Sequence, residues 1–231
     1  MTRYATPAAF KEALEARFRT ASRDTGRDQN RLRMRLVMDR LATLSTFDGG
    51  FRLAWAREIP GAGNVGILSR AFDLSGSPLA EERLLALGGI EPSISCAADG
   101  SFVLAWMRAG EDAYFSIAQL FDANGESNSE VIRPDESGLA QNGVAASMRK
   151  DGSFALAWNR FERDNEESDI QMRLYDPRGT SLGESFPATA SKEGRQMLAV
   201  ASAGQRLFYG EDGRLALAWT GESGGSDKSA A

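Results

Sequence analysis

An eight-residue motif that occurs four times along the chain constrains its fold more than any other feature. It reads DGGFRLAW at 48–55, DGSFVLAW at 99–106, DGSFALAW at 151–158 and DGRLALAW at 212–219. Successive copies are separated by 51, 52 and 61 residues. Self-similarity at a period of this length is the signature of a repeat architecture.

A second signature follows the first three copies of the motif. It reads AFDLSG at 71–76, LFDANG at 120–125 and LYDPRG at 174–179. From the Asp of the first motif to the Asp of the second, the distances are 25, 23 and 25 residues. Two separate motifs therefore keep register across three copies, which indicates one structural module repeated along the chain.

Each module is expected to contain four short antiparallel strands. A strand such as PSISCAAD ends in Asp-Gly, a pair that favours a two-residue hairpin turn of the primed type. In the next strand, SFVLAW, Phe102, Leu104 and Trp106 share one face, and Val103 and Ala105 share the other. Because both faces are apolar, we expect this strand to be buried between neighbouring sheets. The strand FSIAQLF, the turn DANG and a polar outer strand follow.

Four-stranded units of about 40–50 residues are typical of propeller blades. The units, over roughly residues 41–219, resemble the DGxFxxAW-type repeats of bacterial proteins that are presumed to form β-propellers. The predicted fold is mainly β: a propeller-like array of four-stranded antiparallel blades, three complete plus one partial, preceded by a short α-helical hairpin. The expected domains are 1–40 for the hairpin and 41–231 for the repeats, with repeats near 41–90, 91–142, 143–200 and 201–221.

The first forty residues follow a helical period instead. Thr6-Pro7 suits the start of a helix, and Phe10, Leu14 and Phe18 recur at i, i+4 and i+8 to give one apolar stripe. Gly26 ends this helix and Asp28 begins another. Residues 1–45 carry ten Lys and Arg against five Asp and Glu, whereas the rest of the chain is acidic. The candidate nucleic-acid-binding residues of this basic hairpin are Arg31, Arg33, Arg35 and Arg40.

The stretch YATPAAFKEALEARFR, followed by TGRDQNRLRMRLVMDRLA, resembles the N-terminus of AbiEii-type nucleotidyltransferase toxins. That resemblance implies NTP-dependent modification of RNA, with Mg²⁺ held by paired aspartates. The family's D-x-D pair is not matched, because Gly49-Gly50 is followed by Phe72-Asp73-Leu74-Ser75, with Ser75 at the second carboxylate position. Both pieces also recur in later repeats. We therefore interpret FDGGFRLAW as a β-hairpin and expect no catalytic residues there.

The residue inventory narrows the chemistry further. The chain has no histidine, which excludes His-based acid–base catalysis and removes the commonest transition-metal ligand. Cys96 is the only cysteine, so no internal disulfide forms, and its apolar surroundings predict a buried structural thiol. The turn around Asp122 lacks a full calcium loop, and its Asp and Asn suit a turn. No cofactor and no metal site is expected.

Two further expectations concern location. No apolar run approaches the roughly 18–20 residues that span a bilayer, so we expect no membrane association. The charged N-terminus is unlike a secretory signal, so a cytoplasmic location is the default expectation.

The loops after each tryptophan are the candidate binding regions. Trp55, Trp106, Trp158 and Trp219 close the same strand in every copy and are expected to pack in the core. The loops that follow, 56–66, 107–114, 159–170 and 220–229, differ in length and chemistry, and we expect them to emerge on one face. The candidate partner-binding residues in them are Arg57, Asn64, Asp112, Tyr114, Asp164, Glu166 and Asp169.

These observations lead to a functional hypothesis with two alternatives. The main hypothesis is a non-enzymatic β-propeller-like interaction module with a basic helical N-terminal extension, which binds a protein or glycan at the post-tryptophan loops. The alternatives are a toxin-like nucleotidyltransferase acting on RNA with NTP and Mg²⁺, and a propeller-type glycan-binding or hydrolytic protein. Because the fourth unit stops after its second strand, the chain is expected to close its ring as a homodimer or as a small four-bladed ring, or to be a truncated or fused gene product.

Overall fold

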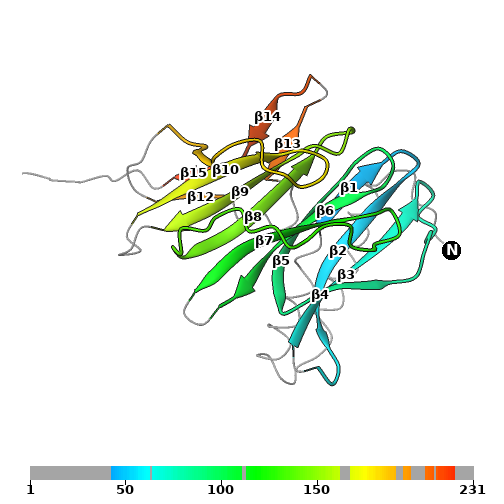
Figure 1. Ribbon diagram of the computed structural model, residues 1–231. Coiled ribbons are helices and arrows are strands. Elements are labelled where there is room, and N and C mark those ends of the chain that lie inside the picture. The colour runs from blue at the N-terminus through cyan, green and yellow to red at the C-terminus, as the bar shows by residue number, and fades with distance from the viewer. Residues whose placement is uncertain are drawn as a thin grey trace, which may run out of the picture.

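The computed structural model describes residues 43–62, 64–110, 113–161, 167–190, 195–198, 206–210 and 212–221. These residues form β-strands joined by turns and contain no helix, so the prediction of a mainly β fold is confirmed. Figure 1 shows the strands as a series of small twisted sheets that follow one another along the chain. The helical hairpin predicted for residues 1–40 lies outside the described residues. Within those residues, no helix is long and apolar enough to cross a membrane.

The first three repeats are antiparallel meanders whose strands pair in sequence order. Repeat 1 contains β1 (Thr43–Phe47), β2 (Gly50–Ile59), β3 (Asn64–Asp73) and β4 (Arg83–Leu87). Repeat 2 contains β5 (Gly89–Cys96), β6 (Phe102–Ala109) and β7 (Tyr114–Phe121), and a bridge from Ala118 to Ile132 stands in the place of a fourth strand. Repeat 3 contains β8 (Gln141–Met148), β9 (Phe154–Phe161), β10 (Ser168–Tyr175) and β11 (Phe186–Pro187).

Repeat 4 has an interrupted first strand. It contains β12 (Gln196–Leu198), β13 (Leu207–Tyr209), β14 (Leu215–Leu217) and β15 (Trp219–Gly221). β12 pairs with β15 and β13 pairs with β14, so two short segments share the role that β8 plays in repeat 3. The last two copies of the motif are 61 residues apart, compared with 51 and 52 for the earlier copies. Most of the additional residues fall between β12 and β13.

The hairpin turns differ from the predicted primed type. Among the described residues, Glu91 is the only non-glycine residue with positive φ, so the Asp of each Asp-Gly pair does not enter the left-handed region. In the turn of repeat 2, Gly100 has a positive φ of 85° and Asp99 does not. Asp99 Oδ1 accepts hydrogen bonds from the backbone N–H (2.9 Å) and the hydroxyl (2.6 Å) of Ser101. The aspartate thus stabilises the turn through its side chain, which explains its recurrence.

The second strand of each repeat packs one large and one small face against its neighbours. Phe154, Leu156 and Trp158 of β9 pack on the side of repeat 2, in one cluster with Val103 and Ala105 of β6. On the other side of β9, the small side chains Ala155 and Ala157 share a cluster with repeat 4. β6 repeats this arrangement, with Phe102, Leu104 and Trp106 packed against Ala54 and Ile67 of repeat 1. We call the two sides the large face and the small face.

Three serines join the first strands of neighbouring repeats at one position of the repeat. Ser45 Oγ accepts a hydrogen bond from Cys96 N (2.9 Å), Ser95 Oγ from Met148 N (2.8 Å), and Ser147 Oγ from Tyr209 N (2.9 Å). First strands have an unpaired edge, and these bonds satisfy one backbone N–H of each following strand. The serines therefore hold the four repeats in register.

Two expectations about single residues have different outcomes. Cys96 is buried, as predicted, and burial raises the pKa of its thiol to about 11. Trp106 and Trp158 pack in the core, whereas Trp219 is 48% exposed, contrary to the prediction of four core tryptophans. β15, which carries Trp219, pairs only with the three-residue β12, so within the described residues no full sheet covers it.

Replacing Ser95 with alanine is expected to destabilise the stack. The substitution leaves the buried N–H of Met148 without its acceptor, which costs about 1–3 kcal/mol of unfolding free energy. Urea unfolding measures this change, with the exposed Ser181→Ala as the control expected to stay within about 0.5 kcal/mol of the parent. Equal midpoints for the two variants would contradict a structural role for the bond.

Acid is expected to weaken the fold through its turn aspartates. Hydrogen bonds from Ser101 and Ser153 lower the pKa values of Asp99 and Asp151 below the ordinary value, and the pKa of Asp176 is lowered mainly by the backbone N–H of Thr180. A carboxyl group with a lowered pKa in the folded state contributes stability that is present above its unfolded pKa and is lost as the pH falls through its folded pKa. The melting temperature should therefore fall below roughly pH 4. A melting temperature that stays constant or rises in thermal scans from neutral pH to pH 3 would be inconsistent with this account.

Candidate functional site

Two of the described first strands are distorted at the same height of the stack. β5 loses its regular pairing between Ile90 and Ser93, and β8 does so between Asn142 and Val144. Aligned by pairing with the second strand, Glu91 (φ 52°) and Gly143 (φ 72°) occupy the same repeat position. The distortions lie near the tryptophan end of the second strands.

A cavity of about 440 Å³ opens beside these distortions, which is within the usual size range of small-ligand sites. Its walls come from the starts of β5, β7 and β8, the ends of β6 and β9, and the residue before β12, so it lies at the seam where repeats 2, 3 and 4 meet. The lining residues are Ile90, Glu91, Met107, Ala113, Tyr114, Ala140, Gln141, Asn142, Phe161 and Arg195.

Gln141 carries a polar group that the described residues leave unsatisfied. Its side chain is only 3% exposed, and its Oε1 accepts a hydrogen bond from the backbone N of Ser116 (2.8 Å), across the seam between repeats 2 and 3. Its amide nitrogen Nε2 is buried and has no hydrogen-bond partner among the described residues. A buried donor without an acceptor is costly, so a ligand in the cavity that supplied an acceptor would be stabilised there.

Glu91 supplies the carboxylate of the cavity, at a strained backbone position. A non-glycine residue at φ 52° is energetically unfavourable, and such strain is often found at functional sites. The side chain of Arg206 lies close enough for the Glu91 charge to act on it. Burial lowers the pKa of the Arg206 guanidinium, and the negative charge of Glu91 opposes that shift. The carboxylate of the site thus has a partly buried cation close to it, although Arg206 does not itself line the cavity.

Aromatic side chains complete the cavity. Tyr114 is the first residue of β7 and is 48% exposed, and Phe161 is the last residue of β9 and is partly exposed. An exposed tyrosine offers a flat apolar surface with a polar tip. The cavity therefore presents apolar faces together with hydrogen-bonding groups of both kinds.

Of the sequence-predicted binding residues that the structure describes, Tyr114 alone lines this cavity. Arg57 forms an ion pair with Glu82 (2.6 Å) in repeat 1, and Asn64 is exposed at the start of β3. Asp169 is occupied by Arg160 (3.2 Å) and by Gln171 Nε2 (2.6 Å). The remaining candidates lie outside the described residues: Asp112, Asp164, Glu166, Arg31, Arg33, Arg35 and Arg40.

Sequence reasoning missed most of the cavity residues, including Glu91, Gln141, Asn142, Phe161 and Arg195. The sequence signal that could have located the cavity lies in the first strands of the repeats rather than in the post-tryptophan loops. Glu91-Pro92 and Asn142-Gly143 interrupt otherwise alternating strands just before the serine positions, and such interruptions indicate a bulge.

No candidate metal centre accompanies the cavity. Within the described ranges, no group of three or more Asp, Glu or Cys side chains is placed to hold a metal ion.

Comparisons with known proteins find similarity only at the level of solved structures. No protein-family model matches the chain, and no curated protein matches it. An endo-arabinase from Bacteroides thetaiotaomicron VPI-5482 is 15% identical with a TM-score of 0.48, covering 77% of this chain and 68% of the enzyme. A thermostable family-43 glycoside hydrolase is 14% identical with a TM-score of 0.45, over 79% and 75%. A glycosyl hydrolase from Bacteroides ovatus is 9% identical with a TM-score of 0.38, over 76% of this chain and 50% of the other.

These comparisons correct the main functional hypothesis. A non-enzymatic interaction module was expected, but the three similar structures are glycoside hydrolases, so that hypothesis is wrong and the glycan-binding alternative agrees better with them. The toxin-like and nucleic-acid hypotheses and the homodimer gain no support. At these identities and TM-scores, the activities of the three enzymes are not transferred to this chain.

The backbone strain at Glu91 predicts opposite effects at two equivalent positions. Glu91→Gly relieves a left-handed conformation that costs an ordinary residue about 1–2 kcal/mol, so a net gain in unfolding free energy of about 0.5–1 kcal/mol is expected. Gly143→Ala should destabilise the protein by about 1–2 kcal/mol, because the added Cβ would also lie 3.2 Å from Asn159 Nδ2. Chemical unfolding of both variants tests this, and destabilisation by Glu91→Gly would show that the glutamate side chain supports the fold.

Proposed function

We propose that the protein recognises a carbohydrate in the cavity at the seam of repeats 2, 3 and 4. The observation that carries the proposal is Gln141, a residue of the cavity wall whose buried Nε2 donor has no acceptor among the described residues. In native structures such groups are usually satisfied, and an unsatisfied one beside a cavity of ligand size points to a bound acceptor.

The mixture of groups around Gln141 suits a sugar better than a purely apolar ligand. A sugar ring has hydroxyl groups around its edge, which both donate and accept hydrogen bonds, and C–H bonds on its faces. Gln141 offers a donor, Glu91 offers acceptors, and Asn142 offers both. Tyr114 offers an exposed ring on which a sugar face can stack.

Recognition is the step that these residues support directly. Glycoside hydrolysis commonly uses two carboxyl groups about 5–9.5 Å apart, and Glu91 is the single carboxylate among the described lining residues. We therefore assign Glu91 the role of a hydrogen-bond acceptor for sugar hydroxyl groups. Product analysis accompanies the binding test, since a second carboxylate outside the described residues would add cleavage.

The same proposal includes a propeller-like arrangement of three full repeats and one partial repeat. It is supported by the alternation of large and small faces and by the adjacency of the first strands, which the serine hydrogen bonds join. In such an arrangement, loops and strand ends from several repeats meet at one site.

A glycan array followed by calorimetric titration of the best oligosaccharide tests the proposal. Tyr114→Ala removes the stacking surface and is expected to weaken binding by roughly tenfold. Gln141→Glu keeps an acceptor for Ser116 N but removes the free donor, and a loss of about 1–3 kcal/mol, or roughly five- to 150-fold, is expected.

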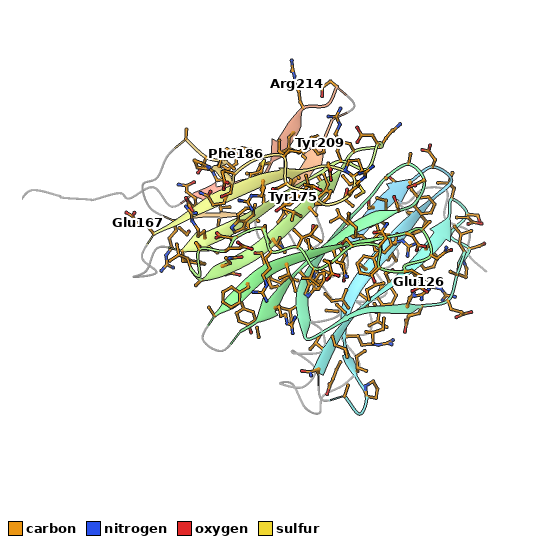
Figure 2. The ribbon with its side chains drawn as sticks, viewed as in Figure 1. Glu126, Glu167, Tyr175, Phe186, Tyr209 and Arg214 are labelled. Atoms are coloured by element: carbon orange, nitrogen blue, oxygen red, sulfur yellow. The ribbon has the colours of Figure 1, made fainter. Side chains whose placement is uncertain are left out.

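Phe186→Ala is the matched control. Phe186, labelled in Figure 2, is also an exposed aromatic residue, but it belongs to β11, the edge strand of repeat 3. It is not one of the residues that line the cavity. Its affinity should equal that of the parent protein. Absence of glycan binding, or equal loss in all three variants, would overturn the proposal.

A further inference from the structure

The large face of repeat 1 has no repeat packed on it among the described residues. In β6 and β9 the large face is packed on the preceding repeat and the small face on the following one. In β2 the corresponding large side chains are Phe51, Leu53 and Trp55. Ala54 points the other way, into the cluster with repeat 2, and the guanidinium of Arg52 lies 4.3 Å from the ring centroid of Phe102. The large face of β2 therefore points away from the rest of the stack.

Part of this face is nevertheless buried, although Trp55 is partly exposed and Leu84, which pairs with Leu68, is 44% exposed. Phe51 is 1% exposed, and Leu53 of β2 and Leu68, which pairs with Trp55 on β3, are also buried. At the opposite end of the stack, the small face of repeat 4 has no repeat beyond it among the described residues, and Phe208 of β13 is 46% exposed. The two ends of the stack thus differ in how far their apolar side chains are exposed. Phe51, Leu53 and Leu68 at the first end are buried within a single chain.

We propose that the N-terminal segment, residues 1–42, packs on the large face of repeat 1 and caps the stack. The segment ends one residue before β1, which belongs to this same sheet, so the chain delivers it to the correct end. Its sequence contains the apolar stripe Phe10, Leu14 and Phe18, which would supply the missing apolar surface. Its excess of basic residues would remain on the solvent side.

Capping would explain why a segment with a helical sequence period precedes a β-repeat array. Stacked repeats bury their faces on one another, so a terminal repeat needs a unit with one apolar and one polar side. The large face needs this cover most, because without it Phe51, Leu53 and Leu68 would be exposed to water. The basic residues then serve solubility at the capped end, and no nucleic acid is required to account for them.

Thiol labelling of the full-length chain tests the cap. A Leu53→Cys substitution places a reporter on the large face, while the native Cys96, buried in the cluster between repeats 1 and 2, reports on the integrity of the stack. The Leu53→Cys thiol is expected to react slowly with a soluble disulfide reagent. Adding Leu14→Asp to the stripe should raise its labelling rate by roughly tenfold or more, because the cap opens, while Cys96 stays protected.

Ala16→Asp is the matched control for Leu14→Asp. It introduces the same charge two residues further on, about 200° around the expected helix and away from the stripe. Its labelling rate should equal that of Leu53→Cys alone. If Leu14→Asp also exposes Cys96, the milder Leu14→Ala takes its place and is expected to speed labelling at the reporter alone.

Three results would overturn the cap. The first is fast labelling of the Leu53→Cys thiol in the otherwise unchanged chain. The second is an equal labelling rate with the stripe and control substitutions. The third is protection that increases with protein concentration, which would assign the cover to a second copy of the chain.

Discussion

The packing of a large face on a small face is the constraint on which the rest of the structure depends. Phe, Leu and Trp at alternate positions of a second strand fill the space beside the small Ala and Val side chains of the second strand in the preceding repeat. Phe154, Leu156 and Trp158 of β9 pack in this way with Val103 and Ala105 of β6. Close packing at interior density requires such pairing, since two large faces would collide and two small faces would leave a void. This pairing gives the stack a direction along the chain.

The direction of the stack brings the first strands together and so creates the site. Once the second strands are packed, each first strand lies beside the next, and Ser45, Ser95 and Ser147 join them. Near the tryptophan end the first strands depart from regular pairing, and Glu91 and Gln141, which lie at these departures, line the cavity. Two of the departures from regular strand pairing therefore lie where the binding site is proposed, as expected of functional sites in natural proteins.

Much of the fold could be predicted from the sequence, because its signals are local. The Asp-Gly motif and the alternation in SFVLAW gave the strands, and the burial of Cys96 followed from its apolar neighbours. The prediction of primed turns was wrong, because the aspartate stabilises the turn through its side chain and does not adopt a left-handed backbone conformation. The exposure of Trp219 was missed because the motif does not show that the strand breaks between β14 and β15, just before this tryptophan.

The site could not be predicted in the same way, because it is assembled from strand ends of different repeats. Gln141 is notable only beside Ser116, 25 residues away, and Glu91 only beside Arg206. Tyr114 was predicted because it lies in a post-tryptophan loop, and it does line the cavity. Asp169 was predicted on the same ground, but its carboxylate forms an ion pair with Arg160 instead. The spacing of the motifs correctly pointed to the tryptophan end of the second strands. Which residues line the cavity there is decided by how the repeats pack, and the sequence does not show this.

A crystal structure of the full chain soaked with the best-binding oligosaccharide from the array tests the central claim most directly. The account predicts a sugar in the cavity at the seam of repeats 2, 3 and 4, with a sugar oxygen within hydrogen-bond distance of Gln141 Nε2 and a ring face against Tyr114. A sugar bound elsewhere on the chain, with the Gln141 amide satisfied by the protein itself, would contradict it.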